Sequence, residues 1–275
     1  MKISIITASY NYAQFIEEAI NSVISQSYQN WELIIVDDGS CDNSLDIIKS
    51  YCKKDSRIKL FQHKSGQNKG LKQTLLLGIK HAKGEWIAFL ESDDYFEPDN
   101  LLKKIEVINK YPEVKLIFNK VKFISEKKCR QQKRYESIQK KLSTMNFPRN
   151  MFYDFYINNM ILTFSCVMVK TDTIKNENFD TPTDSMLDWW LWIHLAFKNN
   201  FYYIDEELTF WRLHDTSYIK TGKKPIFYPT QVQAYKNIYK TNGKSLNLLL
   251  FMIVSNIKLF FVRGYRFLHK EVRVI

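Results

Sequence analysis

Cysteine is scarce in this chain, and its placement excludes two common kinds of site. The 275 residues contain only Cys41, Cys52, Cys129 and Cys166, which are far apart and form no C-x-x-C pair. This spacing suggests neither a zinc site nor a disulfide framework. We therefore interpret the four thiols as small buried hydrophobic residues of a protein in a reducing compartment.

Long apolar runs are also missing. The longest unbroken one, "LLLFMIV", covers only residues 248–254, whereas a helix that spans a membrane needs ~20 mostly apolar residues. At the N-terminus, Lys2 is followed by a short apolar stretch that Ser4 and Thr7 interrupt, which is not the pattern of a signal peptide. We therefore expect a cytoplasmic protein without a membrane-spanning helix.

The net charge of +11 is unevenly distributed along the chain. It is −3 over residues 1–100, +10 over 101–150, −5 over 151–220 and +9 over 221–275. A nucleic-acid-binding protein more often mixes basic and aromatic residues along its main fold, so no nucleic-acid partner is expected. Two separate basic blocks fit an anionic membrane surface or a phosphorylated substrate.

The first half of the chain alternates apolar β-type runs with segments of helical periodicity. Strands are predicted at 2–8, 31–38, 57–63, 85–90 and 114–118, and helices at 14–26, 43–54, 70–84 and 98–111. Alternation at this spacing predicts an α/β fold with a mostly parallel sheet flanked by helices on both faces.

Acidic residues follow two of these strands. Asp37 and Asp38 open the segment "DDGS", and Glu91, Asp93 and Asp94 lie in "FLESDDYFEP". In open α/β sheets a ligand binds beyond the carboxyl ends of the strands, so both clusters are expected to face one crevice. Carboxylates suit Mg²⁺ or Mn²⁺. A solvated acidic loop and a turn remain alternative interpretations of each cluster taken alone.

Four segments in this order resemble the inverting family 2 glycosyltransferases of the GT-A fold. They are residues 3–48, "KGEWIAFLESDDYFEPDNL" (83–101) with its DXD motif, "LDWWLWIHLA" (187–196) and "FWRLHDTS" (210–217). The resemblance implies a GT-A domain over 1–220, with a nucleotide-sugar-binding half at 1–110. The other half, 111–220, would hold the acceptor and the base, and would carry a basic insertion at about 120–150, interpreted as a mobile or hairpin loop.

The resemblance also implies roles for individual residues. Asp188 would be the catalytic base. The nucleotide sugar would contact Ala8, Tyr10, Asp37, Asp38 and Asp93, and the metal would contact Glu91, Asp93, Asp94 and His214. Apart from the resemblance, Trp189 and Trp190 could stack on an acceptor sugar, the alternative being that they belong to the core. The chain departs from the family pattern at Glu91, where Asp is usual, at Leu75 and Leu76, where Arg-Asn is common, and at Leu187, where Glu usually precedes the base.

The implied reaction moves a sugar from a nucleotide-diphosphate donor, most commonly a UDP-sugar, to a hydroxyl of a lipid-linked or cell-envelope glycan. A bound Mn²⁺ or Mg²⁺ would stabilise the diphosphate that leaves, and a carboxylate would take the proton of the attacking hydroxyl. Two other functions stay open: a degenerate, non-catalytic nucleotide-sugar-binding protein, and a sugar nucleotidyltransferase. The latter requires a glycine-rich basic loop after the first strand, which "ASYNYAQ" is not.

The C-terminal segment 221–275 is interpreted as a basic, amphipathic helical extension. Apolar residues recur at helical spacing from Leu246 to Leu268, interleaved with Lys and Arg. Such a helix can lie in the headgroup region of an anionic membrane. We therefore expect peripheral association with the inner face of the cell membrane, the alternative being a helix that packs on the protein's own core.

Overall fold

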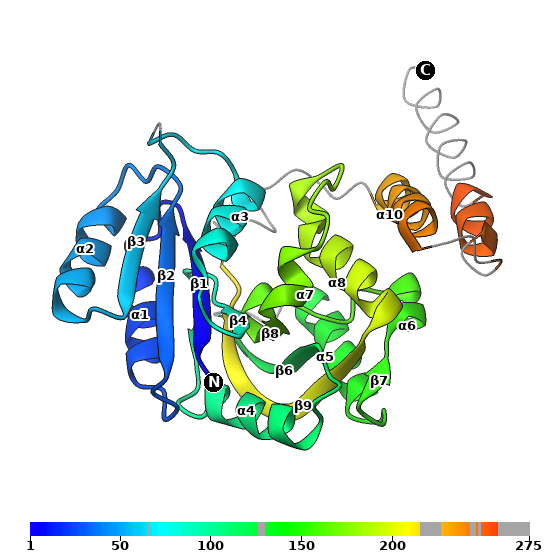
Figure 1. Ribbon diagram of the computed structural model, residues 1–275, viewed down its shortest axis with the longest axis horizontal. Coiled ribbons are helices and arrows are strands. Elements are labelled where there is room, and N and C mark those ends of the chain that lie inside the picture. The colour runs from blue at the N-terminus through cyan, green and yellow to red at the C-terminus, as the bar shows by residue number, and fades with distance from the viewer. Residues whose placement is uncertain (65, 126–129, 215–226, 243–245, 247–248, 258–275) are drawn as a thin grey trace.

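The structure, a computed structural model, describes residues 1–64, 66–125, 130–214, 227–242, 246 and 249–257. A nine-stranded sheet crosses the molecule, in the order β3-β2-β1-β4-β8-β6-β9-β5, with β7 paired to β9 (Figure 1). The strands are β1 (Ile3–Ser9), β2 (Trp31–Asp37), β3 (Ile58–Gln62), β4 (Trp86–Phe89), β5 (Tyr95–Phe96), β6 (Leu116–Ile124), β7 (Arg149–Asn150), β8 (Val167–Lys170) and β9 (Asn200–Arg212).

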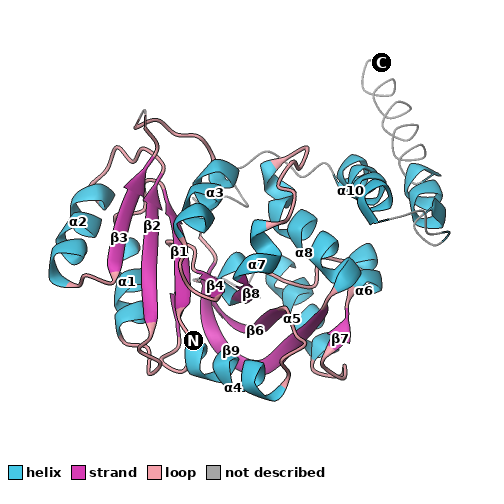
Figure 2. Ribbon diagram, in the orientation of Figure 1, coloured by secondary structure: helices cyan, strands magenta, loops and turns pink. Residues whose placement is uncertain are grey.

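Helices cover both faces of this sheet (Figure 2). They are α1 (Ile16–Ile24), α2 (Ser44–Lys54), α3 (Leu71–His81), α4 (Asn100–Lys110), α5 (Arg130–Leu142), α6 (Phe152–Ile157), α7 (Thr171–Lys175), α8 (Leu187–Lys198) and α10 (Phe227–Asn242), with short 3₁₀ turns η1 (Phe164–Cys166) and η2 (Asp184–Met186). The predicted α/β fold is confirmed, and the first eight predicted elements lie within a few residues of the observed ones. The four strands β3, β2, β1 and β4 are parallel as predicted, but beyond β4 the sheet is mixed, because β8 runs antiparallel to both β4 and β6.

The apolar residues of the central strands alternate between two cores, one on each face of the sheet. Ile5 packs with the residues of α1, α2 and α4, whereas Ile6, its neighbour in β1, packs with those of α3 and α8. Because successive side chains of a strand point to opposite faces, a strand covered on both sides reads as a continuous apolar run. This explains "ISII" and "LIIV" in the sequence.

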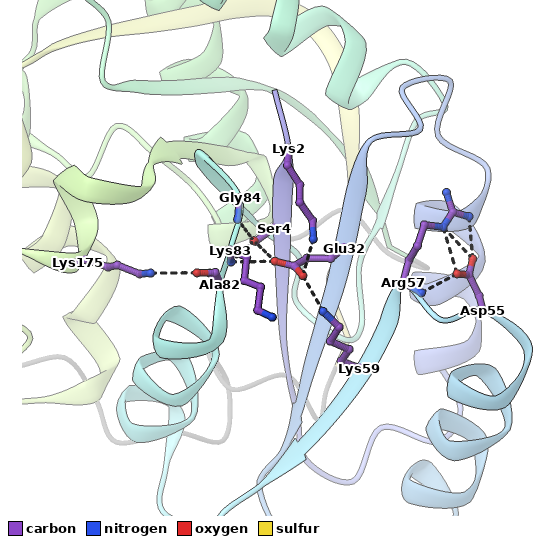
Figure 3. Close-up of polar contacts among 10 residues, drawn as sticks. All are labelled: Lys2, Ser4, Glu32, Asp55, Arg57, Lys59, Ala82, Lys83, Gly84 and Lys175. Carbon is purple, nitrogen blue, oxygen red and sulfur yellow. Dashed lines mark hydrogen bonds and ion pairs between the residues drawn. The ribbon is translucent and has the colours of Figure 1, made fainter.

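A buried carboxylate fastens β1, β2 and β3 together, beside Ala82–Gly84, the loop that leads into β4 (Figure 3). Glu32 is 1% exposed and accepts hydrogen bonds from Ser4 Oγ at 2.8 Å and from the Lys83 amide at 2.8 Å. Lys2 and Lys59 each place Nζ 2.9 Å from its Oε2. These partners lower the pKa of Glu32 to about 2, although burial itself acts in the opposite direction.

Two expectations about the second half of the chain need correction. The basic segment 120–150 is not a loop or hairpin: β6 continues to Ile124, and α5 packs Ile138 and Leu142 into the core. Its apolar residues are few but fall on one helical face, which is enough to bury that face.

Part of the predicted C-terminal extension belongs to the main core. Ala234, Tyr235 and Ile238 of α10 are completely buried and join the cluster formed with α8. Residues 249–257 are helical, as predicted; Phe260, Phe261 and Leu268 lie outside the described residues. In the part of the chain that the structure describes, no helix is long and apolar enough to cross a membrane.

Candidate active site

A cavity of about 580 Å³ opens beyond the carboxyl ends of β1, β2 and β4, where the topology of parallel strands places ligands. Four of the predicted donor-binding residues line it, namely Ala8, Tyr10, Asp38 and Asp93, together with the predicted metal ligand Glu91. Tyr10 is 43% exposed, so its ring is accessible for stacking on a planar ligand.

The second wall of the cavity comes from residues that the sequence did not single out. Tyr12, Asn68, Gly70 and Thr74 contribute from the β1 and β3 sides, and Phe164 and Trp211 from η1 and β9. Leu75, at one of the positions where the chain departs from the family pattern, also lines the cavity. The site is therefore formed by both halves of the chain, which sequence periodicity alone does not predict.

Asp38 lies between the cavity wall and the loop that precedes α3. Its Oδ1 accepts a hydrogen bond from the Lys69 amide at 2.7 Å and its Oδ2 one from the Gly70 amide at 2.9 Å. Oδ1 also lies 3.3 Å from His63 Nε2, whereas Oδ2 keeps a second lone pair with which Asp38 can still accept a bond from a ligand.

Asp37 is not among the residues that line the cavity, and its contact with the donor stays a prediction. It is 1% exposed, and its Oδ1 accepts from the amides of Gly39 and Ser40 at 3.2 and 3.1 Å. It therefore holds the turn after β2. Gly39 in this turn has φ +83, and a Cβ there would lie 2.8 Å from the Gly66 carbonyl oxygen, so the turn requires glycine.

The acidic motif after β4 is held by two buried hydroxyls at the start of η1. Thr163 donates a hydrogen bond to Glu91 Oε2, and Ser165 Oγ donates to Asp94 Oδ2 at 2.6 Å. Ser165 Oγ also accepts the Glu91 amide at 2.9 Å. Nothing in the sequence marks "TFS" as a partner of this motif, because 72 residues separate Thr163 from Glu91.

Asp94 points into the protein, and its assignment as a metal ligand stays a prediction. It is 1% exposed, and its Oδ1 accepts the Arg212 amide at 2.9 Å, while Oδ2 is bound by Ser165. Burial and the charges of Asp93 and Glu91 raise its pKa well above the ordinary range. Asp94 therefore serves to join β9 to the loop after β4.

Asp93 and His214, both predicted metal contacts, lie side by side, with His214 Nε2 3.0 Å from Asp93 Oδ2. Arg212 secures the same loop, because its Nε donates to the Asp93 carbonyl at 3.0 Å and its guanidinium lies 4.7 Å from the centre of the Phe15 ring. Two residues of the segment "FWRLHDTS" therefore act at the acidic motif: His214 contacts the side chain of Asp93, and Arg212 holds its backbone.

The carboxylates of this site repel one another. Burial, together with the charges of Asp93 and Asp188, raises the pKa of Glu91 to about 8. Burial and the same acidic motif raise the pKa of the Tyr12 hydroxyl above its usual value. The cluster is thus arranged to take up positive charge. Within the described residues, however, no group of three acidic, cysteine or histidine side chains is placed to hold a metal ion by itself.

Asp188 is the second residue of α8 and lies in its first turn, directly behind the acidic motif. Burial raises its pKa to about 6, against the hydrogen bonds that favour its ionised form. One of these is from Asn159, whose Nδ2 donates to Asp188 Oδ2 at 2.6 Å. A carboxylate with such a pKa is ionised at neutral pH and remains a competent proton acceptor. Asn159 is a residue that no sequence pattern pointed to.

Trp189 and Trp190 are core residues, so their assignment to the acceptor site is wrong. Each is 1% exposed, and their indole Nε1 atoms donate to the carbonyls of Phe155 and Asn178 at 2.9 and 2.8 Å. The helix α8 is apolar around nearly its whole circumference, because it packs against α6, α10 and the core, and Leu187 is buried as well. A sugar cannot stack on rings that the protein already covers.

This fold and cavity place the protein in the structural class of the GT-A glycosyltransferases. The structure superposes on S. aureus TarS in complex with UDP-GlcNAc with a TM-score of 0.70 at 20% identity, covering 92% of this chain and 70% of that one. It superposes on the mannosyltransferase PcManGT from Pyrobaculum calidifontis, in complex with GDP-Man and Mn²⁺, with a TM-score of 0.64 at 16% identity, covering 93% and 68%.

The chain belongs to glycosyl transferase family 2, whose model matches residues 4–176. It is 30% identical over 244 residues to the putative teichuronic acid biosynthesis glycosyltransferase TuaG of Bacillus subtilis, covering 84% of this chain and 88% of that protein. It is also 37% identical over 212 residues to an uncharacterized glycosyltransferase of Rickettsia conorii, which covers 76% of this chain. The chain spans about a third of the length of its two matched Rickettsia relatives, 32% in each case.

Proposed function

We propose that this protein transfers a sugar, with inversion, from a nucleotide-diphosphate sugar to a hydroxyl of a cell-envelope glycan. The observation that carries the proposal is the cavity itself, which brings Tyr10 and Asp38 to one side and Glu91 and Asp93 to the other, with Asp188 behind the acidic pair. The similar structures of TarS and PcManGT are complexes with UDP-GlcNAc and GDP-Man. UDP is the donor nucleotide we would test first.

In this proposal Asp188 is the general base. Its carboxylate would take the proton of the acceptor hydroxyl as the oxygen attacks the anomeric carbon, which typically contributes ~10²–10⁴-fold to the rate. Asn159 would keep that carboxylate oriented. The D188N variant tests this step, because the amide preserves size but cannot accept the proton. Transfer should collapse while donor binding persists; transfer at a near-normal rate would disprove the assignment.

Glu91 and Asp93 would hold a Mg²⁺ or Mn²⁺ together with donor phosphate oxygens, and His214 lies next to Asp93. The residues fit such an ion, because two cavity-lining carboxylates are hard oxygen donors and because a cation would offset both the burial and the neighbouring charge of Asp93 that raise the pKa of Glu91. When bound, the ion would neutralise charge that develops on the diphosphate.

Calorimetry with UDP, GDP, CDP and dTDP, each in Mn²⁺ and then in EDTA, tests donor and metal together. Metal-dependent binding of one nucleotide supports the proposal. Nucleotide binding of equal affinity in EDTA would show that donor binding does not require a metal ion, and the metal would be dropped from the proposal. Failure of every nucleotide to bind would favour the degenerate scaffold instead.

We also propose peripheral membrane association through the last described helix. Leu246, Leu249, Leu250, Ile253, Val254 and Ile257 are 38–70% exposed, whereas Phe251 packs on Tyr156 with a ring separation of 4.5 Å. Apolar residues exposed in this way suit the headgroup region of a membrane. The L250E/I253E variant should leave the membrane fraction and still bind nucleotide. Unchanged sedimentation would refute this part of the proposal.

A further inference from the structure

The helix α5 carries a stripe of cations that the reaction described above does not use. Lys133 and Lys140 are exposed and stand seven residues apart, as do Arg134 and Lys141. Residues seven apart share a face about two turns, or ~10.5 Å, along a helix. The sequence Arg130–Leu142 contains five basic residues and only one acidic residue, Glu136.

Little negative charge offsets this stripe. Among the residues that the structure describes, no carboxylate lies within 4.0 Å of Lys133, Arg134 or Lys140, and only Lys141 has a distant partner, Asp154 at 3.8 Å. The opposite face of α5 is fixed to the protein. Gln139 exchanges hydrogen bonds of 2.7 and 3.2 Å with the backbone of Val121, and Ile138 and Leu142 are buried. The cations are therefore presented by a rigid element.

The helix is connected to the candidate active site at two places. Tyr135 packs against Trp211 with ring centres 4.9 Å apart, and Trp211 lines the cavity. Arg134 Nη2 donates to Asn158 Oδ1 at 3.2 Å, and the next residue, Asn159, donates to the proposed base Asp188. Tyr135 belongs to the buried face of α5, so within the stripe it is Arg134, through Asn158, that reaches the segment holding Asp188, on the side opposite the nucleotide wall formed by β1 and β2.

We propose that α5 recognises an acceptor glycan that carries repeated anionic groups, phosphodiesters or carboxylates. This inference rests on the proposed glycosyl transfer and specifies its acceptor. Successive anionic groups along an extended polymer can contact cations at several points of the stripe, which favours longer acceptors and guides them toward Asp188. An anionic lipid surface fits α5 less well, because its exposed side chains are polar or charged and its apolar face is already buried.

Binding can be measured without turnover, on the full chain. The probes are a fluorescent oligogalacturonate for carboxylates, a fluorescent glycerol phosphate oligomer for phosphodiesters and a fluorescent neutral dextran of similar length. We expect one anionic oligomer to bind, with an affinity that falls as salt is added, and the dextran not to bind. The K133E/K140E variant should weaken that binding about tenfold or more, since two exposed charge contacts are lost and repulsion is added.

The matched control is K49E/K53E, which reverses two exposed lysines on α2, at the opposite end of the sheet (Figure 1). It should bind the oligomer like the wild type. The affinity of K133Q/K140Q, which removes charge without adding repulsion, should fall between those of the wild type and K133E/K140E. Calorimetry with nucleotide should give the same result for all of these variants, because none of the four lysines lines the cavity.

Three results would overturn the inference. They are no oligomer binding by the wild type, equal oligomer binding by K133E/K140E, and binding lost equally in K49E/K53E. Sedimentation with phosphatidylglycerol vesicles is measured in parallel, and vesicle binding that depends on Lys133 and Lys140 without any oligomer binding would assign α5 to the membrane instead. Failure of the proposed function is separate, because it would appear as absent nucleotide binding or as transfer that survives D188N.

Discussion

Replacement of Glu32 by Gln should remove a large, pH-dependent part of the stability of this protein. The carboxylate is almost completely buried beside the loop that leads into β4, and it is bound by Lys2, Lys59, Ser4 and the Lys83 amide (Figure 3). Glutamine has the same shape and can accept some of these bonds, but it carries no charge for the two ammonium groups. The substitution therefore measures what the negative charge of Glu32 contributes to stability, with the shape of the side chain unchanged.

The magnitude follows from the pKa of Glu32, which falls from 4.5 to about 2 on folding. Each unit corresponds to about 1.36 kcal/mol, so the charge contributes roughly 3 kcal/mol at neutral pH. The side chains of Lys2 and Lys59 are 38% exposed, and solvent screening of their ion pairs lowers this figure toward about 2 kcal/mol. Because the folded pKa is depressed, this stability is complete above pH 4.5 and is lost as the pH falls toward 2.

Urea denaturation of wild type and E32Q at a series of pH values measures this contribution. The difference in unfolding free energy should be about 2–3 kcal/mol at pH 7 and should shrink below pH 4.5. E206Q is the matched control, since Glu206 is 52% exposed and pairs with Lys103 at 3.4 Å; its effect should stay within about 0.5 kcal/mol. A difference below that value for E32Q at pH 7, or one that does not change with pH, would refute the reasoning.

Three further predictions concern other parts of the molecule. N159A should slow transfer about tenfold, the cost of a hydrogen bond to a charged group, and should move the acid limb of the pH–rate profile above about 6, because the bond favours ionised Asp188; an unchanged profile would contradict this role. Lys104 is completely buried, which lowers its pKa to about 7, so stability should rise by about 2 kcal/mol between pH 7 and 9 as the unfolded chain alone stays protonated; K104M should abolish that rise in urea titrations, and a persistent rise would assign it to another group. G84A should cost about 2 kcal/mol or more, because its Cβ would lie 2.5 Å from the Ser4 amide nitrogen; G66A, whose Cβ would contact nothing within 4 Å, should lose only about 1 kcal/mol from its left-handed φ of +59, and a loss in G84A no larger than that of G66A by thermal unfolding would refute the steric argument.

The sequence by itself predicted the first half of the fold closely, because its signals there are local. The runs "ISII" and "LIIV" alternate with helical stripes such as that of α1, and periodicity depends only on neighbouring residues. The same topology placed the residues after β1, β2 and β4 at one edge of the sheet. Ala8, Tyr10, Asp38, Glu91 and Asp93 accordingly line one cavity.

Burial and pairing in the second half were decided by tertiary structure alone. Trp189 and Trp190 could face an acceptor or the core, and only the packing of α6 and α10 around α8 selected the core. Asp94 resembles a metal ligand in sequence, yet Ser165 and Arg212, 71 and 118 residues away, bind both of its oxygens. Asn159 acquires its position beside Asp188 in the same way. Contacts between distant residues depend on how the whole chain folds, so no local pattern records them.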